Sequence, residues 1–172
     1  MKYHLSLRIV HWLVAFLVSV MLICGFTMTS LDAKNYPIKW QLYGWHQDLG
    51  ILILLLMLFR LVLRHLTIIP AVSREFSRIE RVGASVVHYL FYGILIIEPV
   101  VGYLMSSYGG HDVYFFGIKV PMLVSLNKEL AGRFAELHEI VAFILIFTIA
   151  LHVLGALKHL YIDKKDIIHR MV

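Results

Sequence analysis

The chain has 172 residues, of which 60% are hydrophobic and only 16% are Asp, Glu, Lys or Arg, and its mean hydropathy is +0.79. So little charge excludes an ordinary water-soluble domain and indicates an integral membrane protein. The net charge of +5 does not indicate nucleic-acid binding, because the basic residues are interspersed with long apolar runs. The single cysteine, Cys24, excludes an intrachain disulfide and a cysteine-based metal site.

Four apolar segments follow one another, and each is long enough to cross a bilayer. They are residues 8–29, 43–66, 83–107 and 135–160. The start of the first resembles a signal peptide, but the run from Ile9 to Met28 is too long for one, so we expect a retained span. The predicted fold is all-α: a four-helix transmembrane bundle that forms a single domain over residues 1–172.

Basic residues are unevenly divided between the two sides of this predicted bundle. The side with both termini and the 67–82 connection holds eleven: Lys2, Arg8, Arg60, Arg64, Arg74, Arg78, Arg81, Lys158, Lys164, Lys165 and Arg170. The other side holds five: Lys34, Lys39, Lys119, Lys128 and Arg133. The positive-inside rule therefore predicts that both termini are cytoplasmic.

Two histidines bracket the fourth span. His138 and His152 are 14 residues apart, since 152 − 138 = 14. On a helix this spacing is about 21 Å, with the two side chains within about 40° of the same face. The helix therefore presents one imidazole near each membrane surface.

Depth in the membrane pairs these histidines with two others. His11, at the start of the first span, matches the cytoplasmic level of His152, and His46, at the start of the second, matches the outer level of His138. Imidazole is a good axial ligand for haem iron, so the pattern predicts two stacked haems. The alternative to haem ligation is that each histidine is a separate, hydrogen-bonded polar group of the core. Zinc is disfavoured as the bound metal, because two histidines per site are too few ligands for it.

Two more residues share these faces. Arg60 follows His46 by 14 residues, and a guanidinium there suits a haem propionate, unless Arg60 only marks the membrane boundary. Gly25 follows His11 by 14 residues, where a missing side chain would let the backbone approach the outer porphyrin, unless it serves helix packing.

The third span adds His88 near its cytoplasmic start. His88 could replace His11 as a ligand, bind a propionate or donate a proton to a quinone, and we favour the last two roles. His159 could line the same quinone site with Arg81, or lie at the interface as a snorkelling side chain. Glu98, in mid-membrane, must be protonated, paired or facing a wet cavity, with a proton relay as one option.

The order and spacing of several short motifs resemble the bacterial di-haem cytochrome b561 family, which is related to the cytochrome b subunits of hydrogenases and formate dehydrogenases. The motifs are Arg8-Ile9-Val10-His11-Trp12-Leu13, Trp45-His46-Gln47-Asp48-Leu49-Gly50, Arg60-Leu61-Val62-Leu63-Arg64, Val87-His88-Tyr89, Pro99-Val100-Val101-Gly102, and Leu137-His138-Glu139 with His152. The resemblance covers almost the whole chain. It implies that His11 and His152 bind an inner haem b and that His46 and His138 bind an outer one.

The resemblance also implies a function in the bacterial inner membrane. The closest described activity is superoxide oxidase, in which superoxide is oxidised to dioxygen at the periplasmic face and ubiquinone near the inner face accepts the electrons. The alternatives are an electron carrier that anchors a periplasmic dehydrogenase or hydrogenase, and a non-redox membrane protein. An electrostatic funnel for superoxide is not evident, because six acidic residues on the outer side offset its five Lys and Arg.

Overall fold

Four long helices make up most of the computed structural model, which describes residues 2–34, 36–70, 76–165 and 167–172. They are α1 (Leu5–Ser30), α2 (Ile38–Leu66), α3 (Arg78–Tyr108) and α4 (Lys128–Leu157). The last helix continues into a π-helical turn, η1 (Lys158–Ile162), and a 3₁₀ turn, η2 (Ile168–Arg170), lies near the C-terminus. The first three segments expected to span the membrane lie within α1, α2 and α3, and the fourth lies within α4 and η1. Arg74, one of the basic residues counted above, lies outside the described residues.

Each of the four helices is long and apolar enough to cross a membrane. Large apolar side chains such as Phe16 (65% exposed), Ile23 (68%) and Phe147 (63%) point out of the bundle. A helix satisfies its own backbone hydrogen bonds, so these surfaces suit contact with lipid. The arrangement is that of a membrane helical bundle.

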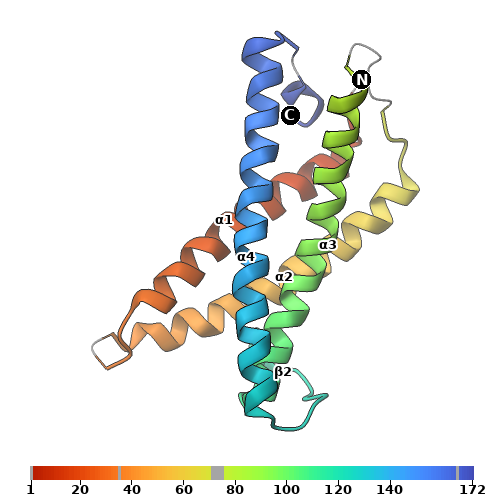
Figure 1. Ribbon diagram of the computed structural model, residues 1–172. Helices are drawn as coiled ribbons and strands as arrows, with labels where there is room; N and C mark the ends of the chain where they lie inside the picture. The colour runs from red at the N-terminus through yellow and green to blue at the C-terminus, as the bar shows by residue number, and fades with distance from the viewer. Residues whose placement is uncertain (1, 35, 71–75, 166) are drawn as a thin grey trace.

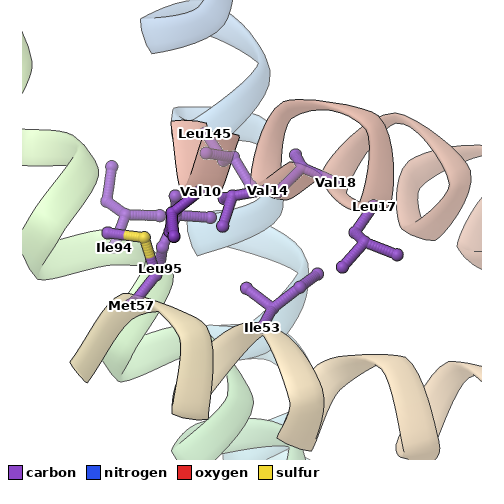
Figure 2. Close-up of a cluster of buried hydrophobic side chains, with 9 residues drawn as sticks. All are labelled: Val10, Val14, Leu17, Val18, Ile53, Met57, Ile94, Leu95 and Leu145. Carbon is purple, nitrogen blue, oxygen red and sulfur yellow. The ribbon is translucent and has the colours of Figure 1, made fainter. Parts of the chain in front are cut away.

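The helices form two antiparallel hairpins that cross each other, α1 with α2 and α3 with α4 (Figure 1). Nine buried apolar side chains from all four helices meet at the crossing (Figure 2). Leu145 is the contribution of α4, and it lies seven residues from both His138 and His152. The apolar core therefore lies midway between the two histidine levels of α4.

Both termini and the α2–α3 connection lie at one end of the bundle (Figure 1). The backbone N–H of Tyr3 donates to the carbonyl of Arg170 at 3.1 Å, and the indole N–H of Trp12 donates to the carbonyl of Met171 at 2.8 Å. The guanidinium of Arg170 also donates to the carbonyl of Pro70 at 3.1 Å. The C-terminal segment therefore ties the start of α1 to the end of α2.

At the opposite end, the α3–α4 connection contains a short hairpin of β1 (Tyr114–Phe115) and β2 (Ile118–Lys119). Its turn residues Phe116 and Gly117 have φ angles of 48° and 84°, in the left-handed region. The N–H of Phe116 donates to Oδ1 of Asp48 on α2 at 2.6 Å. This bond fastens the loop beside the part of α2 that carries His46.

We expect Ile53→Ala to lower the free energy of unfolding by about 2 kcal/mol, because it removes packed methyl groups from the central cluster. This value is near the low end for a buried isoleucine, because lipid is as apolar as the packed core. Ile53 is 3% exposed in the central cluster, whereas Leu55 on the same helix is 49% exposed and serves as the control in Leu55→Ala. Unfolding in detergent micelles by added sodium dodecyl sulfate measures the difference. Equal losses in the two variants would contradict the packing described here.

Candidate functional site

At the level that the sequence predicts to be the outer one, called the outer level below, His46 of α2 faces His138 of α4. The centres of their imidazole rings are 6.1 Å apart, and the ring planes are inclined at 76°. Both side chains are partly buried, and the Nδ1 atoms of both are buried without a hydrogen-bond partner. Two facing, partly buried imidazoles are a donor set that suits a metal ligand site.

Two glycines make room for these rings. A Cβ on Gly25 of α1 would lie 3.4 Å from Cε1 of His46, and a Cβ on Gly102 of α3 would lie 3.1 Å from Cε1 of His138. Larger residues at Gly102 would press on the ring, because such a distance is tighter than ordinary side-chain contacts. The outer histidine pair is thus bounded by the backbones of α1 and α3.

At the inner level, His11 of α1 faces His152 of α4 in almost the same arrangement. Their ring centres are 6.2 Å apart and their planes are inclined at 81°. His88 of α3 also contacts His152, with ring centres 5.7 Å apart at 63°, and the ring of Phe91, one turn along α3, lies 5.3 Å from that of His152. Three histidines therefore gather at the inner level, whereas the outer level has two.

Arg60 lies at this inner level. Its guanidinium is close enough to interact electrostatically with His11, His88 and His152. Its Nε donates to the hydroxyl of Tyr92 at 3.3 Å, and Arg64 lies over the ring of Tyr92 at 5.8 Å. Arg60 therefore places a positive charge near the inner pair.

The geometry of both pairs fits an iron held between two imidazoles. Two imidazoles on opposite sides of one metal, each with a metal–nitrogen distance of about 2 Å, have ring centres roughly 6 Å apart. The observed 6.1 Å and 6.2 Å agree with this, and the glycine beside each outer ring leaves room for the ring. Each pair therefore fits a site in which one iron is held by two imidazoles, as in a b-type haem.

Among the described residues, the group that could surround a single ion with three ligands lies elsewhere. It consists of Glu80, His159 and Asp163, near the end of α4. The ammonium of Lys158 already lies there, bonded to Glu80 at 2.5 Å and to Asp163 at 2.8 Å. A lysine between the two carboxylates takes the place of a metal ion, so this cluster is a salt-bridge network.

His159 belongs to this network, and not to the inner histidine group. Its Nδ1 is 2.6 Å from Oδ2 of Asp163, and its ring contacts that of Phe76 with centres 5.0 Å apart. Arg81 donates to the carbonyl of Phe76 at 2.8 Å. Within the part of the chain that the structure describes, no hydrogen bond, ion pair or ring contact joins His159 to His88. The two predicted quinone-site histidines therefore occupy separate places.

Glu98 has a partner that the sequence analysis did not predict. Its Oε1 lies 3.1 Å from Nδ1 of His138, although the two groups are not aligned as a hydrogen bond. The sequence holds one indication of this contact. Glu98 precedes Gly102 by four residues, so the two share a face of α3, and Gly102 is the residue that lies against the ring of His138.

Two of the five outer cations are paired with acidic side chains. Lys119 bonds Asp112 at 2.7 Å, and Arg133 bonds Glu129 at 2.7 Å. The hydrogen bond to Asp112 raises the pKa of Lys119 above its usual value, so it stays charged. Each of these cations is nevertheless neutralised by its partner, in agreement with the charge balance in the sequence.

Comparison with known proteins relates the chain to one family. A family model described as prokaryotic cytochrome b561 matches residues 2–172. Cytochrome b561 homolog 1 of Escherichia coli (strain K12) is 31% identical over 127 residues, which are 74% of this chain and 72% of the relative. Cytochrome b561 homolog 2 of the same organism is 28% identical over 170 residues, 94% and 86% of the two chains. A protein named probable superoxide oxidase CybB, from Yersinia pestis, is 30% identical over 172 residues, 95% and 91% of the two chains.

The salt-bridge network at the end of α4 predicts a pH-dependent stability. The ammonium of Lys158, and then the imidazole of His159, hold the pKa of Asp163 below its usual range. Such a carboxylate stabilises the fold at neutral pH, and its contribution is lost as the pH falls through its pKa in the folded chain. We expect Asp163→Asn to unfold at a lower temperature than the wild type at neutral pH and at the same temperature in acid.

Thermal unfolding at a series of pH values in detergent measures this difference. Glu136→Gln is the control, because Glu136 has no ion pair among the described residues. A difference between the Asp163→Asn variant and the wild type that persists unchanged in acid would show that the network does not act through the Asp163 carboxylate.

Proposed function

The chain belongs to the prokaryotic cytochrome b561 family, and we propose that it carries electrons through two b haems from superoxide outside the bacterial inner membrane to ubiquinone near the cytoplasmic side. Family membership makes it a multi-pass membrane protein of electron transfer with an oxidoreductase role and b-type haem. The observation that carries the two-haem proposal is the presence of two histidine pairs of nearly equal separation on one helix, at 6.1 Å and 6.2 Å.

In this proposal His46 and His138 are the axial ligands of the outer haem, and His11 and His152 those of the inner one. The geometry favours His11 over His88, because the His11–His152 pair matches the outer pair in distance and inclination. When bound, the two haems supply one-electron redox centres at two depths of the membrane. The chain's own residues set their spacing, since 14 residues of α4 separate the two levels by about 21 Å.

Arg60 and His88 complete the inner site in this assignment. The guanidinium of Arg60 suits a haem propionate, because it can form two parallel charge-assisted hydrogen bonds. Its position close to three inner histidines supports that role. Positive charge at this level also favours the reduced state of a bound redox centre, and so attracts the electron inward.

The donor is superoxide in this proposal, supported by the similarity to the protein named probable superoxide oxidase CybB. Two superoxide ions each lose one electron and leave as dioxygen. One ubiquinone takes up these two electrons and two protons to give ubiquinol. We place both termini in the cytoplasm on the positive-inside rule, so that His46 and His138 are on the periplasmic side.

The quinone would bind at the inner end of α3. His88 is exposed there and touches His152, so it can pass a proton to a quinone beside the inner haem. An apolar groove on α3 lies beside His88 in the sequence and suits an isoprenoid tail. It is lined by Val86, Tyr89, Leu90, Gly93, Ile94 and Ile97. His159, held by Asp163, is the second candidate for a proton donor at this end.

A second candidate function is an electron carrier that docks a periplasmic dehydrogenase or hydrogenase. The outer loop favours it, because Ile118 (71% exposed) and Leu123 (79%) present apolar side chains on its surface. Co-purification of a soluble redox subunit, without reduction of the haems by superoxide, would select this second function.

We expect His46→Ala and His138→Ala each to lower the haem content from two to one per chain and to leave the inner haem intact. His11→Ala should instead remove the inner haem, and His88→Ala should keep both. Pyridine haemochrome assays with redox titration of the remaining haem measure these outcomes. Loss of both haems from a folded His46→Ala variant, or loss of a haem from His88→Ala, would contradict the assignment.

Rapid mixing with superoxide tests the donor and the acceptor separately. We expect superoxide to reduce the haems of the purified wild type, and ubiquinone to reoxidise them. In His88→Ala, reduction by superoxide should be unchanged and reoxidation by ubiquinone should be slowed by about 10-fold or more, the usual effect of losing a proton-transferring group. His65→Ala, at the exposed end of α2, is the control. Haems that do not respond to superoxide would refute the superoxide activity and leave electron transfer from another donor.

A further inference from the structure

Glu98 lies inside the α3 span with a side chain that is only 13% exposed. A carboxyl group is costly at this depth, so it must have a specific partner. Its Oε1 is 3.1 Å from Nδ1 of His138, and its Oε2 is buried without a hydrogen-bond partner. Within the described residues, His138 is the ionisable group that it meets.

The ring of His138 also has a buried polar atom without a hydrogen bond. Its Nδ1 is buried and makes no hydrogen bond, and the ring edge with Nδ1 and Cε1 lies against Gly102. Gly102 is one turn beyond Glu98 on the same face of α3. Nδ1 and Cε1 are the ring atoms closest to this stripe of α3, and Nε2 is the farther nitrogen at 3.8 Å from a Cβ on Gly102, so we take Nε2 as the nitrogen for a ligand.

A histidine that binds a metal through one nitrogen carries a hydrogen on the other, and this N–H needs an acceptor. A carboxyl oxygen in that position selects the tautomer, orients the ring and makes the imidazole a stronger electron donor to the metal. Stronger donation stabilises the oxidised metal and lowers its reduction potential. Glu98 is within reach of this N–H.

The other three histidine ligands differ in this respect. No carboxylate pairs with His11, His46 or His152 among the ion pairs of the described residues. The inner pair instead has the guanidinium of Arg60 nearby. The surroundings of the two levels therefore push the two reduction potentials in opposite directions.

We propose that Glu98 is a positioning residue for the outer haem: its carboxyl oxygen accepts a hydrogen bond from Nδ1–H of His138 and lowers the reduction potential of that haem below that of the inner one. This inference rests on the proposed function, in which His138 is an axial ligand. Its consequence is that electrons move inward downhill, from the outer level to the inner.

The test compares Glu98→Leu, which removes the acceptor, with Glu98→Gln, which keeps an amide oxygen at the same position. Potentiometric titration of the full-length protein with haems bound measures both midpoint potentials at one pH. Glu98→Leu should raise the midpoint potential of the outer haem, leave that of the inner haem unchanged and weaken retention of the outer haem by about 10-fold to 100-fold. Glu98→Gln should restore most of the potential and the retention. Val100→Ala, at a 42% exposed neighbouring position, is the control and should match the wild type.

Three outcomes would overturn the inference: unchanged potentials in Glu98→Leu, a shift confined to the inner haem, or equal shifts in Glu98→Leu and Glu98→Gln. If Glu98→Leu loses the outer haem, wild-type-like retention and potential in Glu98→Gln supports the inference, and loss in both variants overturns it. Failure of the proposed function gives a different result, because the wild type would then lack two haems or His138→Ala would keep both.

Discussion

Two imidazoles on one face of α4 meet histidines from two different helices, and this geometry constrains the whole bundle. His138 needs a partner from α2, and His152 needs one from α1. One straight helix can serve both only if the α1–α2 hairpin crosses it, so that α1 is near at one level and α2 at the other. The crossing hairpins of Figure 1 have this arrangement, and the apolar cluster of Figure 2 holds the crossing point.

The two levels each hold a similar pair of imidazole rings, but different chemical groups surround the two pairs. The outer pair has glycine backbones and the carboxyl group of Glu98 beside it, and the hairpin anchored by Asp48 lies nearby. The inner pair is enclosed by a third histidine and by Arg60. A redox group held by imidazoles responds to such neighbours, because nearby positive charge favours its reduced state and stronger ligand donation favours its oxidised state. Under the proposed function, this asymmetry would give electron transfer a direction that four ligands in identical surroundings would not supply.

At the inner end of the molecule, His88 and His159 have different neighbours. His88 lies beside His152, whereas His159 is bound into the network of Lys158, Glu80 and Asp163. The π-helical turn Lys158–Ile162 places Lys158 and His159 side by side at the end of α4, where they link it to the start of α3. This network fastens the helix ends, and leaves His88 accessible for chemistry.

Much of this organisation follows from the sequence alone. The apolar runs predicted four spanning helices, because only a helix of about 20 residues satisfies its backbone in lipid. The 14-residue spacing on α4 showed which histidines share a face, because helix periodicity is a local property. Only the tertiary structure decided how helices rotate about their axes and cross one another. These rotations bring His88 to His152 and not to His159, and bring Glu98 to His138, which is 40 residues away (138 − 98 = 40). Periodicity within one helix cannot give such contacts, since they depend on how side chains of different helices pack together.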